Sequence, residues 1–227
     1  MAKSAMPAAT DVLKKACRAV KSIEHQKLNL PRRVPVMVLP TLLFPNSLLP
    51  LHIFEPRYRA MLNTALEEER MFCIALSKRG IDAWASPADF HHIAGLGLVR
   101  ACVGREDGTS HLILQGLARV KLVKFVQEAP FPIAQIRELP SEPAEDFEAE
   151  ALTAKLLSVC AQLREQGLGV PASLDEQLAQ IENAEVLADV IAHTFLRDPF
   201  RRQDVFEELR IGERLRLLIR HLSAEAA

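Results

Sequence analysis

Between residues 34 and 139, apolar residues recur in short runs separated by turn signals, and this pattern predicts strands. In the run 118–127, apolar residues such as Val120 and Leu122 alternate with basic ones, which is typical of a strand that is buried on one face only. The basic positions of this run are Arg119, Lys121 and Lys124. Repeated short strands favour a closed or partly open barrel. The predicted strands cover residues 34–39, 71–76, 91–103, 110–114, 118–127 and 131–139.

Glycines mark two special places in this β-rich part. Asp107 and Gly108 predict a tight hairpin turn between two strands, because both residue types tolerate a positive φ. Gly95 and Gly97 lie inside one predicted strand, where glycine indicates a β-bulge or the close approach of another backbone segment.

One helix is predicted within the β-rich part, and it begins at Pro56. Proline suits the first turn of a helix, where its missing N–H would have no partner in any case. Glu55 precedes this helix, and a carboxylate near a helix N-terminus is stabilised without any catalytic role, so we interpret it as structural. The apolar stripe of the helix consists of Tyr58, Met61, Leu62, Ala65 and Leu66.

Beyond residues 140–145, which have the composition of a linker, the apolar period changes to 3.6 and predicts helices. The first helix ends near Gly167-Leu168-Gly169, and Asp198-Pro199 starts another that continues to Leu209. The apolar positions of the others include Leu152, Leu156, Val159, Leu163, Leu187, Val190, Ile191, Phe195, Leu215, Leu218, Ile219 and Leu222. The pattern therefore predicts an α+β protein, β-rich over residues 34–140 and helical over 145–223.

Residues 1–33 form a separate N-terminal extension with one predicted basic amphipathic helix. Thr10 or Asp11 can cap it. Its apolar stripe is Leu13, Ala16, Cys17 and Val20, and its basic side is Lys14, Lys15, Arg18 and Lys21. Three interpretations stay open: a helix docked on the body, a helix on a membrane surface, or part of an organelle targeting peptide. We favour a docked or partly disordered extension.

Charge divides the chain unevenly and bears on its partners. Residues 1–33 carry eight Lys or Arg against Asp11 and Glu24, a net charge of +6; because the whole chain carries −1, residues 34–227 carry −7. A body this acidic argues against nucleic acid as a partner. The four cysteines have no metal-binding or disulfide spacing, which predicts a reducing compartment, and no apolar run could span a bilayer. We therefore expect a cytoplasmic protein.

The residues give no support for catalysis, for a cofactor or for a metal. No G-x-x-x-x-G-K-[ST] phosphate loop occurs, and no serine or cysteine stands in a nucleophile motif. His91 and His92 are adjacent in a predicted strand, so their side chains point to opposite faces and cannot chelate one ion together. His52 is interpreted as a hydrogen-bonded structural histidine. We predict that the protein is not an enzyme and binds no cofactor.

A family resemblance is carried by residues 50–61. Their sequence, PLHIFEPRYRAM, closely resembles the P-L-H-I-F-E-P-R-Y-x-x-M signature in the N-terminal domain of the ATP-dependent Lon proteases. Residues 116–122 resemble the family element G-x-x-R-[FV]-x-[IL], and residues 93–97 its central glycine-containing strand. Residues 202–215 are similar to its bundle pattern, although Arg202 replaces the usual lysine and Arg210 stands where an acid is common.

The resemblance extends over about residues 34–222 and carries implications for fold and function. It implies a PUA-like β pseudo-barrel followed by a C-terminal helical bundle. It also implies recognition of an unfolded or partner polypeptide, without the ATPase and peptidase domains, for which these residues leave no room. An RNA-binding PUA-like module is the alternative, which a basic surface formed by Arg100, Arg105, Arg119, Lys121 and Lys124 would favour. A pseudo-enzyme or small-molecule sensor is a third possibility.

The connection 41–49 is too apolar for an ordinary solvent loop and invites a binding hypothesis. Leu42, Leu43 and Phe44 are the candidate peptide-binding residues. Two interpretations compete: Leu43, Phe44 and Leu48 fill the end of the barrel, or some of them stay exposed as a groove for apolar polypeptide segments.

Overall fold

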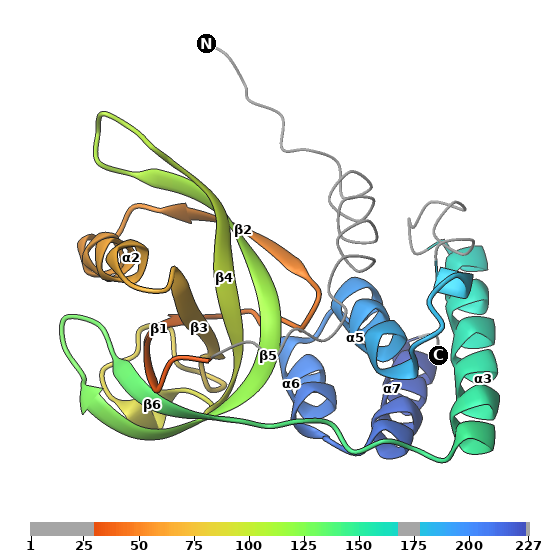
Figure 1. Cartoon of the computed structure of the whole chain (residues 1–227). Helices are drawn as coiled ribbons and strands as arrows, with labels where there is room; N and C mark the ends of the chain where they lie inside the picture. The colour runs from red at the N-terminus through yellow and green to blue at the C-terminus, as the bar shows by residue number, and fades with distance from the viewer. Residues whose placement is uncertain (1–29, 168–177, 226–227) are drawn as a thin grey trace, which may run out of the picture.

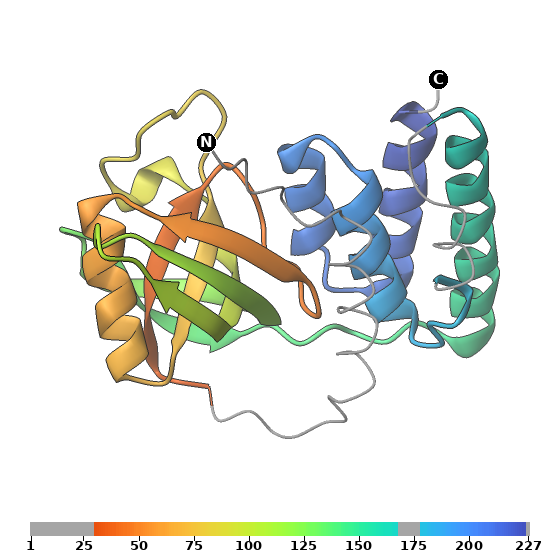
Figure 2. The same ribbon diagram turned by 90° about the horizontal axis from the view of Figure 1, so that it is seen from above.

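The computed structural model describes residues 30–167 and 178–225, which form a β-rich part and a helical part lying side by side (Figure 1). Helix α2 (Pro56–Glu67) lies on the side of the β-rich part away from the helical part, and α3 (Asp146–Glu165) is the helix farthest from the β-rich part, as both views show (Figure 2). The prediction of an α+β fold is confirmed. The predicted N-terminal helix lies outside the described residues.

Six strands form one sheet that closes on itself. Their order is β2-β5-β4-β3-β1-β6, and β6 also pairs with β5, which closes the ring. All neighbours are antiparallel except β1 and β3, which run parallel. A parallel pair needs a crossover connection, and here β2 and α2 lie within it. The strands are β1 (Arg33–Leu39), β2 (Leu48–Ile53), β3 (Met71–Leu76), β4 (Ile93–Gly104), β5 (Ser110–Gln127) and β6 (Ile133–Glu138).

The longest strand, β5, corrects one prediction. The runs 110–114 and 118–127 are not separate strands, because the chain continues through Gly116 as one strand of 18 residues. Its N-terminal half pairs with β2 and its C-terminal half with β6, while β4 pairs along both. Register shifts relative to β4 and β6 let one long strand serve both halves of the barrel.

The positions predicted from the glycines are confirmed, although Gly108, and not Asp107, has the positive φ. Gly108 has a φ of 78° in the turn between β4 and β5, a conformation that favours glycine. The Gly95 backbone lies so close to Leu43 that a Cβ atom added there would stand 2.0 Å from the Leu43 carbonyl oxygen. A register shift also occurs between Leu96 and Gly97, so this part of β4 combines a bulge with a close approach.

The helices agree with the apolar spacing. In α2, the residues Tyr58, Met61, Leu62 and Ala65 are buried, as the stripe predicts. The Oδ1 atom of Asp198 accepts a hydrogen bond of 2.8 Å from the Phe200 N–H and so caps α6 as expected. The helices are α2 (Pro56–Glu67), α3 (Asp146–Glu165), α5 (Ala184–Phe195), α6 (Pro199–Glu207), α7 (Ile211–Glu225) and the 3₁₀ helix η1 (Pro87–Asp89).

The connection from β6 to α3 runs along the base of the helical part (Figure 1). Glu142 fixes it there, since its N–H donates to the Leu209 carbonyl at 2.8 Å and its carbonyl accepts from the Ile211 N–H at 2.9 Å. A linker with these backbone bonds is anchored to the helices. The division into domains at 140–145 stays a prediction.

Candidate functional site

The three residues predicted to bind peptide lie in the core. Leu42 is 1% exposed, and Leu43 and Phe44 are completely buried, so these three side chains form no open groove in the structure. Their role in peptide binding stays a prediction. The connection packs directly on the sheet because Gly95 and Gly116 have no side chains. A Cβ atom would lie 2.0 Å from the Leu43 carbonyl oxygen at position 95 and 2.0 Å from the Phe44 carbonyl oxygen at position 116. The competing interpretation agrees with the burial of Leu43 and Phe44, but not with Leu48, which is only half-buried.

The signature residues around Pro56 have structural contacts. The Tyr58 hydroxyl donates to the Val38 carbonyl at 3.0 Å and accepts from the Trp84 indole N–H at 3.0 Å, and burial raises the pKa of Tyr58. Glu55 forms an ion pair of 2.8 Å with Arg57, whose guanidinium lies over the Tyr58 and Trp84 rings. Glu55 makes no side-chain cap of α2, yet its contacts support the structural interpretation.

One surface of the sheet carries several exposed apolar side chains, and no sequence pattern predicted it. We call it the outer face: the solvent side of β2, β5 and β4, together with Phe54 directly after β2. Alternate residues of these strands, such as Ile53, Leu112 and Val99, point into the core, so those between them point outward. The members of the outer face are Leu48, Pro50, His52, Phe54, Ala101, Val103, His111 and Ile113.

The outer face is most open at the end that carries the β4–β5 hairpin, which extends beyond the rest of the barrel (Figure 1). Phe54 is 59% exposed and Val103 is 66% exposed. His52, predicted to be a hydrogen-bonded structural residue, is instead exposed, and its ring stacks on His111 of the neighbouring strand at a centroid distance of 4.4 Å. Large apolar and aromatic side chains thus meet solvent together on one sheet surface.

The free edge of β2 is blocked by a proline. Pro50 has no N–H, so Pro50 and its partner Ile113 must form a non-hydrogen-bonded pair. In such a pair the backbone polar groups point away from the partner strand, and here they point to the free edge of β2. The missing N–H therefore interrupts the row of donors on which another strand could add.

One pocket and the adjacent histidines His91 and His92 are further places where chemistry could occur. One pocket of about 260 Å³ lies between β1, the signature residues and Trp84. His91 Nδ1 lies 3.3 Å from Glu207, and His92 Nε2 lies 2.8 Å from the Pro87 carbonyl, so each ring has its own partner. Within residues 30–167 and 178–225, no group of three or more His, Cys, Asp or Glu side chains is arranged to hold a metal ion.

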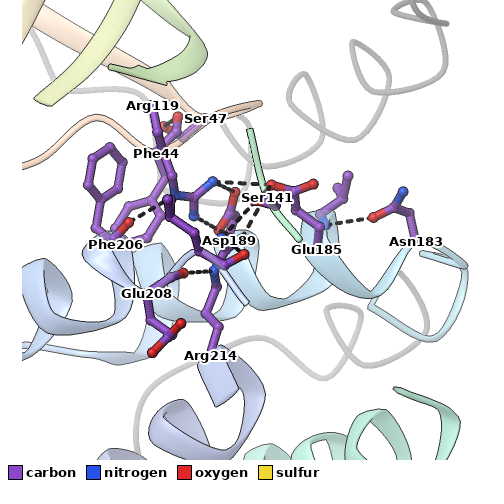
Figure 3. A network of polar contacts seen from close by, with 12 residues as sticks. Phe44, Ser47, Arg119, Ser141, Asn183, Glu185, Asp189, Phe206, Glu208 and Arg214 are labelled. Carbon is purple, nitrogen blue, oxygen red and sulfur yellow. Dashed lines mark hydrogen bonds and ion pairs between the residues drawn. The ribbon is translucent and has the colours of Figure 1, made fainter. Parts of the chain in front are cut away.

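A buried polar network joins the barrel to the helices (Figure 3). Arg119 of β5 donates through both terminal nitrogens to the two carboxylate oxygens of Asp189 in α5 and through Nε to the Phe206 carbonyl at 3.0 Å. Arg214 of α7 lies 3.6 Å from the same carboxylate and 3.3 Å from Glu185. Burial raises the pKa of Asp189, whereas the two guanidinium groups act in the opposite direction and stabilise the carboxylate.

Arg119 is not on the exposed face of β5 where the alternation of the strand predicted it. Its position also concerns the alternative function, RNA binding. The alternation of β5 placed it on a polar face with Lys121 and Lys124, but it is only 2% exposed. It faces the helices at the point where β5 passes them, and Asp189 neutralises its charge. One of the five residues that could have formed a basic RNA-binding surface is therefore part of the interface between barrel and helices.

His193 in α5 gives a pH prediction. Its Nδ1 atom is shielded from solvent and has no hydrogen-bond partner among the described residues, and burial lowers its pKa to about 4. The unfolded chain therefore binds a proton on this residue at a higher pH than the folded chain does. We expect the protonation of His193 in the unfolded chain to lower the free energy of unfolding by about 2 kcal/mol as the pH drops from 7 to 4.5.

Denaturant unfolding at several pH values measures this effect. His193→Leu should flatten the pH dependence between pH 6.5 and 4.5, whereas His92→Gln, at an exposed position, should leave it unchanged. An equally steep dependence in His193→Leu would show that other groups cause it.

Comparison with known proteins defines the class of this chain. Residues 33–224 match the family model described as the ATP-dependent protease La (LON) substrate-binding domain, so the chain belongs to this family. The fold agrees with solved structures: the N-terminal domain of a Mycobacterium avium complex Lon protease superposes with a TM-score of 0.65 and 21% identity, covering 84% of this chain and 98% of that one. A Lon N-terminal domain protein from Xanthomonas campestris gives a TM-score of 0.57 and 19% identity over 83% of this chain and 97% of that one.

The Lon proteases that this chain resembles are much longer than the chain itself. The Lon protease of Desulfosudis oleivorans is 26% identical over 196 residues, which are 86% of this chain but 24% of the relative. The Lon protease of Xanthomonas oryzae is 28% identical over 193 residues, 83% of this chain and 23% of the relative. The chain thus spans about a quarter of the length of these relatives, and the match lies in the substrate-binding domain. None of the helices in the two described ranges combines the length and apolar character of a membrane-spanning helix.

Proposed function

We propose that this protein binds unfolded or partner polypeptides through the outer face and performs no chemistry of its own. The observation that carries the proposal is the exposure of Phe54 and Val103 beside the stacked His52–His111 pair. Membership in a family described as a substrate-binding domain, together with relatives named Lon protease, supports recognition of a polypeptide.

Burial of apolar surface supplies the binding free energy in this proposal. Covering one large side chain completely contributes about 1.5–3 kcal/mol. Phe54 and Val103 are already partly covered, so together they support weak binding, on the order of micromolar when the rest of the outer face contributes. Weak contacts of this kind suit a protein that has to bind and release many different chains.

Side chains, rather than strand addition, are the proposed mode of recognition. Pro50 removes an N–H from the middle of the free edge of β2, so a client strand would lack a partner for one of its carbonyl groups. The side chains of the outer face carry no such restriction. A client can therefore contact them in any backbone conformation that presents apolar residues.

Substitutions at the most exposed positions test the proposal. Phe54→Ser combined with Val103→Ser should weaken binding of fluorescently labelled β-casein by at least about tenfold, because 1.4 kcal/mol of lost binding free energy is a factor of 10. The melting temperature should change little, since both side chains are mostly exposed. Fluorescence anisotropy titration at neutral pH measures the affinity.

A matched control comes from the helical part and the other half of β5. Phe147 is 83% exposed and Val123 is 57% exposed, and neither belongs to the outer face. Phe147→Ser with Val123→Ser removes the same side-chain types and should leave casein binding unchanged. Equal loss of binding in both double variants would mean that general surface hydrophobicity, and not the outer face, holds the client.

We also place this role in a reducing compartment such as the cytoplasm. Cys73, Cys102 and Cys160 are free thiols. Burial raises the pKa of Cys160 to about 12 and raises that of Cys73 as well, which keeps both thiols protonated and unreactive. These properties support structural cysteines in a reducing environment.

A further inference from the structure

The centre of the outer face is occupied by two ionisable rings. His52 of β2 lies directly opposite His111 of β5, and Val103 of β4 lies opposite His111 on its other side. Pro50, two residues before His52, fixes the parity of the pairing, so His52 and His111 also form a non-hydrogen-bonded pair. Side chains approach each other most closely at pairs of this type.

The two rings stack face to face. Their planes are inclined by only 9°, and the Phe54 ring lies 5.6 Å from the His52 ring. Neither histidine makes a hydrogen bond or an ion pair within residues 30–167 and 178–225, so no partner holds a proton on either ring. As long as neither ring carries a positive charge, the pair therefore adds no charge beside Phe54 and Val103.

We propose that protonation of the His52–His111 pair releases bound polypeptide, which makes the outer face a pH-sensitive binding surface. This inference rests on the proposed function. Protonation places positive charge in the middle of an apolar contact, and covering an unpaired charge with apolar client residues is unfavourable. A second proton adds repulsion between rings whose centroids are 4.4 Å apart.

The charged groups around the pair favour the neutral form of His111. Desolvation, then Arg105 and His52, lower the pKa of His111, whereas Asp107 raises it. Arg105 and Asp107 both lie in the β4–β5 turn, and the Asp107 carboxylate is already engaged by the Thr109 backbone N–H at 2.8 Å and by its hydroxyl at 2.7 Å. Arg59 of α2 also faces this turn, with its guanidinium against Gly108. β4 places Val103, an uncharged residue, beside His111.

Binding of labelled β-casein at a series of pH values between 7.5 and 5.5 tests the inference. Wild-type protein should bind at pH 7.5 and lose affinity several-fold by pH 5.5, as histidine gains its proton; the lowered pKa of His111 moves the steepest part of the loss toward the acid end of this range. Circular dichroism at each pH checks that the chain stays folded, because His193 also weakens the fold in acid.

Two variants separate the pair from other effects of acid. His52→Phe with His111→Phe keeps aromatic surface without ionisation and should bind casein at pH 5.5 as tightly as at pH 7.5. His92→Gln, an exposed histidine outside the outer face, should keep the wild-type pH profile. A pH-dependent loss that persists in the double phenylalanine variant would overturn the inference.

The proposed function and the pH inference fail in different ways. If wild-type protein binds no casein at pH 7.5, the proposed function is wrong and the inference falls with it. If it binds equally well from pH 7.5 to 5.5, the outer face still stands as a binding surface and only the pH inference is wrong. If binding at pH 7.5 weakens several-fold by pH 5.5 only in proteins that keep both histidines, the result supports both the proposed function and the pH inference.

Discussion

Asp189→Ala is expected to lower the free energy of unfolding by about 3–5 kcal/mol, the usual cost of breaking a buried ion pair. The substitution leaves the Arg119 and Arg214 guanidinium groups buried without the carboxylate that they share. Glu185 still contacts both arginines but is about one-third exposed, so it replaces Asp189 only in part. Chemical denaturation at neutral pH measures the change.

Replacing all three charged residues distinguishes two effects: the cost of leaving buried arginines without a carboxylate, and the loss of the ionic attraction itself. Arg119→Met, Asp189→Leu and Arg214→Met together remove every buried charge of the trio, and a well-packed apolar replacement is often neutral or stabilising. The triple variant should therefore be more stable than Asp189→Ala alone. Arg210→Ala, which removes an exposed ion pair with Glu208, should have far less effect. A small loss in Asp189→Ala would mean that water reaches the network.

Leu43→Ser combined with Phe44→Ser should lower the free energy of unfolding by several kcal/mol. Truncation of one buried Phe or Leu side chain costs about 2–5 kcal/mol, and a hydroxyl without a partner adds to this. Both residues are completely buried, and Phe44 packs edge-on against Phe206 of α6 at 5.2 Å between ring centroids. Thermal melts followed by circular dichroism measure the loss.

An exposed phenylalanine provides the control for this variant. Phe147→Ser should leave the melting temperature nearly unchanged, because the side chain is 83% exposed. If Leu43→Ser with Phe44→Ser also melts like the wild type but loses casein binding, the connection is a peptide site after all. That outcome would require Leu43 and Phe44 to leave the core when a client binds.

Local rules predict much of this fold because they depend on neighbouring residues alone. The apolar stripe of α2 follows from the spacing of Tyr58, Met61 and Ala65, and the cap of α6 follows from Asp198 before Pro199. Gly95 indicates a close approach because a strand interior otherwise disfavours glycine. In each case the cause lies within a few residues of the effect.

The failures depend on residues far away in the chain. Arg119 alternates with Lys121 as if both met solvent, but its partner Asp189 lies 70 residues later on a helix that covers only part of β5. Whether Leu43 is a surface anchor or a core residue depends on Gly95 and Gly116, two glycines that leave space for it. The outer face was missed because its members come from three strands and none forms a motif in sequence.

The position of Phe44 has a consequence for any attempt to divide the chain. Leu42, Phe44 and Leu76 of the β-rich part belong to the same apolar cluster as Phe206 and Leu215 of the helices. A fragment that ends near residue 140 would expose these side chains to water, and the resulting apolar patch would promote aggregation. The smallest piece able to present the outer face in a soluble form therefore includes the helices, even though none of them contributes a residue to it.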